Sequence, residues 1–115
     1  MMRISGTLTD SGEPVTVKLQ SDIETVVTLP PPDGSNSLRI INRATSQLFV
    51  AFGEGATIAP VDVGGIVHVG PGNGRGIVIE NDPRSAEATV ATCLLMPSQG
   101  EVTFQRCDIQ PLTIN

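Results

Sequence analysis

The sequence predicts an all-β protein: an antiparallel β-sandwich or jelly-roll-like barrel in a single domain, with little or no helix. Val, Ile and Thr, which favour strands, supply 33 of the 115 residues, whereas Trp and Tyr are absent. The 12 Gly and 9 Pro residues divide the chain into short segments that end in turns. A chain of this length is expected to fold as one domain around a sizeable core.

Two strands are expected in the N-terminal part. Apolar and polar residues alternate over residues 15–19, and residues 23–29 form a second run rich in β-branched side chains. Three consecutive prolines open residues 30–35, a segment that can be neither a helix nor a central strand. We therefore expect residues 1–36 to form N-terminal strands or an arm that ends in a Pro-rich joint. Residues 37–115 are expected to form the main β-sandwich.

The centre of the chain is predicted to form a β-hairpin with residues 43–45 as its loop. The expected pairs are Leu38 with Val50 and Ile40 with Leu48. This register places all four apolar side chains on one face, which is typical of a strand pair that covers a core.

A second hairpin is predicted around the turn at residues 97–100. The expected pairs are Leu95 with Val102 and Cys93 with Phe104. These four side chains again share one apolar face. Two independent hairpins with apolar faces favour an antiparallel architecture.

Between the hairpins, residues 66–69 and 77–79 are expected to be strands. They flank a glycine-rich segment, residues 70–76, which we interpret as a long hairpin loop. A phosphate-binding loop would need a helix after it and usually a Lys, and neither is present in the sequence there. The chain is expected to close with a short strand over residues 109–114, and a helix over residues 85–96 is the one helical alternative.

The two cysteines are predicted to be free thiols. In the register of the second hairpin, Cys93 faces inward, whereas Cys107 lies opposite Val90 on the outer face. A disulfide would need a β-bulge that turns one of them around. Cys93 is therefore expected to be a small buried hydrophobe.

No catalytic, metal or cofactor site is expected. The chain has one histidine, so a multi-histidine metal site is excluded, and no nucleophile–base pair is visible. A net charge of −5 with a single Lys argues against binding to nucleic acid. No apolar run is long enough for a signal peptide or a membrane span, so we expect the chain to fold in a cytoplasm and to have no membrane partner.

Apolar side chains on outward-facing strand positions are the candidate interaction residues. Val67 and Val69 are expected to face inward with Ile77 and Ile79. A small soluble monomer rarely exposes a contiguous apolar patch, so outward apolar positions suggest contact with either a second sheet or another subunit, and we expect neighbouring subunits to cover them. The predicted interface residues are Ile41, Phe49, Ile66, His68 and Val78.

From Ser37 onward, the chain resembles the small β-sandwich structural proteins of tailed bacteriophages. The resemblance lies in strand patterns and glycines: residues 38–42, residues 47–55, the strand that begins at Gly64, residues 88–95 and residues 100–106. Cys107 stands where a glycine is more usual in such proteins, and residues 1–36 match no part of the pattern.

The resemblance implies a non-enzymatic virion component, a decoration or cement protein that binds the head exterior and stabilises the shell. Its implied partners are the major capsid protein and further copies of itself, as a dimer or trimer. A head–tail junction, tail or fibre-base protein is the alternative within virions. A carbohydrate-binding β-sandwich is more distant, because sugar rings are normally held against Trp or Tyr, which this chain lacks.

Overall fold

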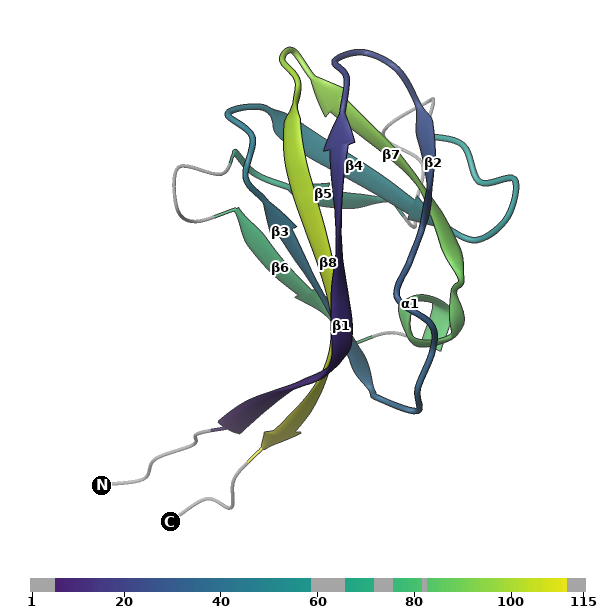
Figure 1. Ribbon diagram of the computed structural model, residues 1–115, viewed down its shortest axis with the longest axis vertical. Helices are drawn as coiled ribbons and strands as arrows, with labels where there is room; N and C mark the ends of the chain where they lie inside the picture. The colour runs from purple at the N-terminus through teal and green to yellow at the C-terminus, as the bar shows by residue number, and fades with distance from the viewer. Residues whose placement is uncertain (1–5, 59–65, 72–75, 82, 112–115) are drawn as a thin grey trace.

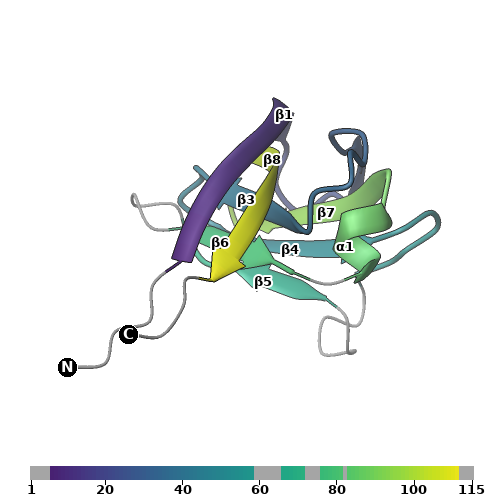
Figure 2. The ribbon, with the colours of Figure 1, turned by 90° about the horizontal axis from the view of Figure 1, so that it is seen from below.

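The protein is a two-layered β-sandwich, which confirms the fold class expected from the sequence. The computed structural model describes residues 6–58, 66–71, 76–81 and 83–111. In this part of the chain, two four-stranded antiparallel sheets form the two layers (Figures 1 and 2). We call them sheet A and sheet B.

Each sheet combines strands from distant parts of the sequence. Sheet A has the order β1 (Gly6–Leu19), β8 (Gly100–Pro111), β3 (Ser37–Asn42), β6 (Ile77–Glu80). Sheet B has the order β2 (Thr25–Thr28), β7 (Val90–Met96), β4 (Gln47–Phe52), β5 (Val67–Val69). The short helix α1 (Pro83–Glu87) precedes β7, so residues 90–96 form a strand and not the helical alternative. Strand β8 runs on to Pro111, and residues 112–115 of the expected closing strand lie outside the described residues.

The hairpin expected at the centre of the chain is wrong. Strand β3 pairs with β6 and β8 in sheet A, whereas β4 pairs with β5 and β7 in sheet B. The chain therefore forms an arch that crosses the core between the two strands. In an arch, the apolar side chains of the two strands face each other across the core, whereas in a hairpin they lie side by side on one face of a sheet. The alternation of apolar and polar residues is the same in both cases, so it cannot distinguish an arch from a hairpin.

The second hairpin is wrong for the same reason. Strand β7 lies in sheet B and β8 lies in sheet A, although all four side chains of the expected pairs are fully buried in the core. Strands β5 and β6, which flank the glycine-rich segment, also lie in different sheets, so they do not form the expected hairpin. Among the described strands, β4 and β5 are the one pair of successive strands that lie in the same sheet.

Both N-terminal strands are built into the sandwich. Strand β1 pairs with β8 over most of its length, with a bulge between Ser11 and Val15, and β2 pairs with β7. The boundary expected at residue 36 therefore does not separate an arm from the sandwich among the described residues. The first part of β1 and the last part of β8 do project together from the body as a two-stranded ribbon (Figure 1).

The core lies between the two sheets and follows the predicted alternation in most strands. Sheet A contributes fully buried side chains such as Ile40 and Phe104, and sheet B contributes Val50 and Leu95. In strand β6, the inward and outward side chains are exchanged relative to the prediction. Its middle residue, Val78, packs against the core, whereas Ile77 and Ile79 point outward.

Arg106 is a charged residue inside the fold, with 1% of its surface exposed. It follows Val102 and Phe104 on the inward face of β8, where its guanidinium group donates hydrogen bonds to backbone carbonyls of two other segments. The acceptors are the carbonyl oxygens of Pro30 (3.0 Å), Ser85 (2.6 Å), Ala86 (3.4 Å) and Ala88 (2.6 Å). Arg106 thus ties the Pro-rich segment and the end of α1 to sheet A.

Asn42 organises the arch between β3 and β4. Its buried side-chain amide donates hydrogen bonds to the carbonyl oxygens of Ser46 (2.7 Å), Gly70 (2.9 Å) and Val69 (3.3 Å). Its side-chain oxygen accepts a hydrogen bond from the N–H of Ala44 (2.9 Å). The arch is therefore fixed to the end of β5 in sheet B through one side chain.

The arch between β3 and β4 also packs against the turn between β7 and β8. The N–H of Ser98 donates to the hydroxyl of Ser46 (2.7 Å), and a side chain at Gly100 would lie 2.3 Å from the Cβ of Ala44. The close approach of these two segments therefore requires glycine at position 100.

Gly100→Ala should destabilise the protein by about 1–3 kcal/mol, because the added methyl group has no space. Ala44→Gly should recover part of that loss in the double variant, since it removes the nearest atom. Gly70→Ala is the control, because nothing lies within 4 Å of the position of its added Cβ. Urea unfolding of the wild type, the two single variants, the double variant and the control gives the five free energies of unfolding that are compared. If the loss of unfolding free energy in the double variant equalled the sum of the two single losses, positions 44 and 100 would not be in contact.

Candidate protein-interaction surfaces

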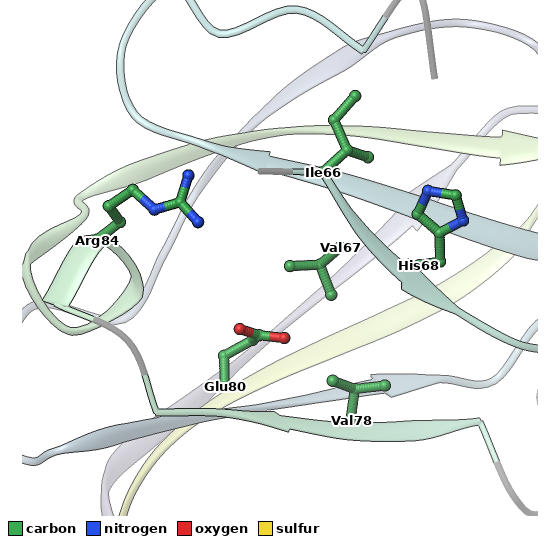
Figure 3. A pocket seen from close by; sticks show the side chains of 6 residues that line it. All are labelled: Ile66, Val67, His68, Val78, Glu80 and Arg84. Carbon is green, nitrogen blue, oxygen red and sulfur yellow. The ribbon is translucent and has the colours of Figure 1, made fainter. Parts of the chain in front are cut away.

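A groove opens along one side of the sandwich, where the edges of the two sheets meet. Strand β5 is an edge of sheet B and β6 is an edge of sheet A. The groove has a volume of about 420 Å³ and is lined by Ile66, Val67, His68, Val78, Glu80 and Arg84 (Figure 3). Its lining combines three aliphatic side chains with one imidazole, one carboxylate and one guanidinium group.

The groove carries no recognisable catalytic arrangement. His68 is exposed, and its ring makes an edge-to-face contact with Phe49 at 4.9 Å between ring centroids. Glu80 and Arg84 direct their side chains into the groove from β6 and α1 (Figure 3). Among the described residues, no three His, Cys, Asp or Glu side chains gather as metal ligands. The groove thus presents a few aliphatic side chains and both signs of charge.

The structure brings three of the five predicted interface residues together. Ile66, His68 and Val78 all line the groove, although they come from two different sheets and not from one hairpin. Val78 and Ile66 are half-buried, because Val78 packs against the main core and Ile66 against a smaller apolar cluster. Ile41 lies elsewhere, half-buried on the outer face of sheet A.

Phe49 was expected on an exposed face and is instead 8% exposed. It does point outward from sheet B, but the segment that follows β4 folds back over it and buries Ile58 completely. The N–H of Ile58 donates to a carboxylate oxygen of Glu24 (2.7 Å), and the hydroxyl of Thr92 donates to the carbonyl of Ala56 (2.8 Å). These bonds hold the covering segment in place, so Phe49 is a core residue of this second cluster.

A second candidate surface combines the predicted Ile41 with two residues that the sequence analysis did not predict. Ile41 on β3 and its paired residue Ile77 on β6 lie side by side on the outer face of sheet A, and Ile79 follows along β6. Ile77 is 51% exposed and Ile79 is 39% exposed. We call these three residues the isoleucine face. The sequence Ile-Val-Ile is apolar at every position, so its pattern contains no signal for which side faces out.

The two cysteines are both free and buried, Cys93 in the main core and Cys107 between β1 and β3. Cys107 was expected on the outer face of its sheet and is completely buried there. Burial raises the pKa of Cys93 to about 12 and also raises the pKa of Cys107. Both thiols therefore stay protonated and unreactive at neutral pH.

Asp33 joins the Pro-rich segment to the bulge of β1. Its carboxylate accepts hydrogen bonds from the hydroxyl of Ser11 and from the N–H of Ser35 (3.0 Å). These hydrogen bonds, that of Ser11 above all, lower the pKa of Asp33 from 3.8 to about 2.

The carboxylate of Asp33 should make the free energy of unfolding depend on pH in the acidic range. Because its pKa is lowered by folding, its contribution is complete above pH 3.8 and is lost as the pH falls through about 2. Asp33→Asn should remove this contribution to the free energy of unfolding. Ser11→Ala should bring the pKa of Asp33 in the folded state closer to 3.8, so the contribution should be lost over a narrower pH range. Urea unfolding at a series of pH values tests this. An unfolding free energy that falls equally with acid in wild type and in Asp33→Asn would contradict it.

Comparisons with protein-family profiles, with curated proteins and with solved structures found no match to this chain. Within the described residues, no helix has the length and apolar character that a membrane crossing requires.

Proposed function

We propose that this chain is a structural protein of a bacteriophage particle, a decoration protein that binds the outside of the head and stabilises the shell. The proposal assigns it no catalytic role. The resemblance of residues 37–106 to small virion β-sandwich proteins supplies the phage context. The observation that carries the assembly role is the isoleucine face, because exposed apolar side chains grouped on an edge strand are typical of a protein–protein contact.

The charge of the chain supports a position on the head exterior. The net charge is −5 and the isoelectric point is about 4.6. An acidic surface with a single Lys would be repelled by packaged DNA, so the outer surface suits it better than the lumen. The partners in this proposal are the major capsid protein and further copies of the chain.

Decoration stabilises a shell by mass action. A protein that binds the assembled lattice, and not the separate subunits, lowers the free energy of the lattice. Contacts between neighbouring copies add avidity to weak individual sites. Small exposed apolar surfaces are therefore sufficient for this role, although each one is too small for a tight binary complex.

The copy number per particle tests the proposed position. Purified particles are analysed by quantitative gel densitometry and by antibody-gold labelling of intact heads. Decoration predicts hundreds of copies and dense labelling over the whole head. About a dozen copies at one vertex or on the tail would replace decoration by a junction or tail role. Absence from the particle would overturn the proposal.

A further inference from the structure

We propose that two copies of the chain pair through β6, antiparallel and about a two-fold axis, so that their A sheets join into one continuous sheet. The inference rests on the proposed assembly role and names its first partner, a second copy of the chain.

Among the described strands, none pairs with the outer edge of β6, so this strand ends sheet A. The N–H of Asn42 donates to the carbonyl of Gly76 (2.7 Å), which fixes the phase of the ladder between β3 and β6. Along one strand of an antiparallel pair, every second residue is hydrogen-bonded to the partner strand. Counting from Gly76, Val78 and Glu80 therefore direct their N–H and C=O groups toward β3. Ile77 and Ile79 therefore direct their N–H and C=O groups away from β3, toward the free edge.

One register of self-pairing uses all of these groups. If Val78 lies opposite Val78 of the second copy, Ile77 lies opposite Ile79 of that copy, and the reverse pair follows by symmetry. Both of those pairs are then hydrogen-bonded, with the Val78 pair as the close, non-hydrogen-bonded pair between them. A shift by one residue would place outward side chains opposite inward ones. A shift by two residues would place the carboxylate of Glu80 beside the apolar Val78.

The side chains of β6 fit this pairing. The isoleucine faces of the two copies would become continuous across the axis, which covers Ile77 and Ile79. On the inner side, the two Val78 side chains would meet where the groove opens. The two Glu80 carboxylates would lie at opposite ends of the paired strands and would not repel each other.

Strand β6 carries none of the lysines, prolines or bulges that protect many natural edge strands from pairing. Its protection is limited to its short length of four residues and to one charged side chain, Glu80, at its end. The other edge of sheet A differs, because β1 carries Lys18, Pro14 and the bulge after Ser11. The two edges of one sheet are thus unequal, and β6 is the one open to a second copy.

Sedimentation velocity of the purified chain at high micromolar concentration tests the dimer. The wild type should sediment with twice the chain mass of 12.0 kDa. Ile77→Lys should reduce it to a monomer, whereas Ile23→Lys should remain a dimer. Ile23 is the matched control because both isoleucines are 51% exposed. A monomeric wild type, or an Ile77→Lys variant that remains dimeric, would overturn the inference.

Cross-linking tests the register. Val78→Cys places a thiol at the two-fold axis, where paired Cα atoms about 4.5 Å apart fit a disulfide. Mild oxidation should convert this variant to a covalent dimer. The wild type, whose own cysteines are buried, should not cross-link, and neither should Val26→Cys on the exposed edge strand β2. Equal cross-linking of the Val26→Cys and Val78→Cys variants would overturn the inference.

These measurements use the isolated chain, so they separate the inference from the proposed function. A β6 dimer that is absent from particles would support the inference and overturn the proposed function. A monomer that still covers the head in hundreds of copies would support the function and overturn the inference.

Discussion

Arg106→Met should destabilise the fold by about 3 kcal/mol or more, because the change removes every donor to a set of carbonyl groups, and each buried carbonyl left without a partner costs about 1–3 kcal/mol. Arg106 bonds the carbonyl of Pro30 and those at the end of α1. Burial lowers the pKa of Arg106, and the negative charge of Asp33 opposes that shift. The guanidinium group is thus retained for its hydrogen bonds, although its burial is unfavourable.

Chemical unfolding of three variants measures this effect. Arg106→Lys should lose much of the stability too, because an ammonium group cannot reproduce the planar arrangement of donors. Arg84→Met is the control, since Arg84 is exposed on α1, and its change should cost about 1 kcal/mol or less. If Arg106→Met were as stable as Arg84→Met, the role assigned to Arg106 would be wrong.

Asn42→Asp should cost about 3 kcal/mol or more at neutral pH, although the two side chains have almost the same shape. The amide of Asn42 donates to three carbonyl oxygens, and a carboxylate would replace that donor by a repelling, desolvated charge. The pKa of the introduced carboxyl group should be raised in the folded state. Its protonation then favours folding, so the deficit relative to wild type should shrink as the pH falls.

The control for Asn42→Asp is Asn36→Asp at an exposed position. The side-chain amide of Asn36 also donates a hydrogen bond, to the carbonyl of Ile109 (3.0 Å). Because Asn36 is exposed, water can solvate the charge of an aspartate at this position. Its change should cost less than Asn42→Asp in urea unfolding at neutral pH. An equal loss in both variants would show that the arch does not depend on the buried donor.

The sequence predicted the fold class and the inward faces of most strands, but not which strands pair. Leu38, Ile40, Leu48 and Val50 were correctly placed in the core, because strict alternation reports burial of one face. The alternation of apolar and polar residues does not indicate whether two successive strands pair in one sheet or face each other across the core. Buried Asn42 at the end of β3 is the residue that distinguishes the arch, and its partner Val69 on β5 is 27 residues away in the sequence.

The candidate surfaces were predicted in part. Ile66, His68 and Val78 do share one groove, although the reasoning placed them on a hairpin that does not exist. Ile77 and Ile79 were missed because an uninterrupted apolar run has no periodicity. Phe49 was placed on the correct side of its strand, but the segment that covers it is polar and glycine-rich at its start. Its cover depends on Glu24, which is remote in sequence.

The thermal stability of the head tests the central claim most directly. Particles that lack the chain are heated with and without the purified wild-type protein, and the melting temperature of the shell is measured. The account predicts that added chain binds to saturation and raises the melting temperature of the shell, because it binds the assembled lattice preferentially. A melting temperature that does not change at saturating chain concentration would contradict the account.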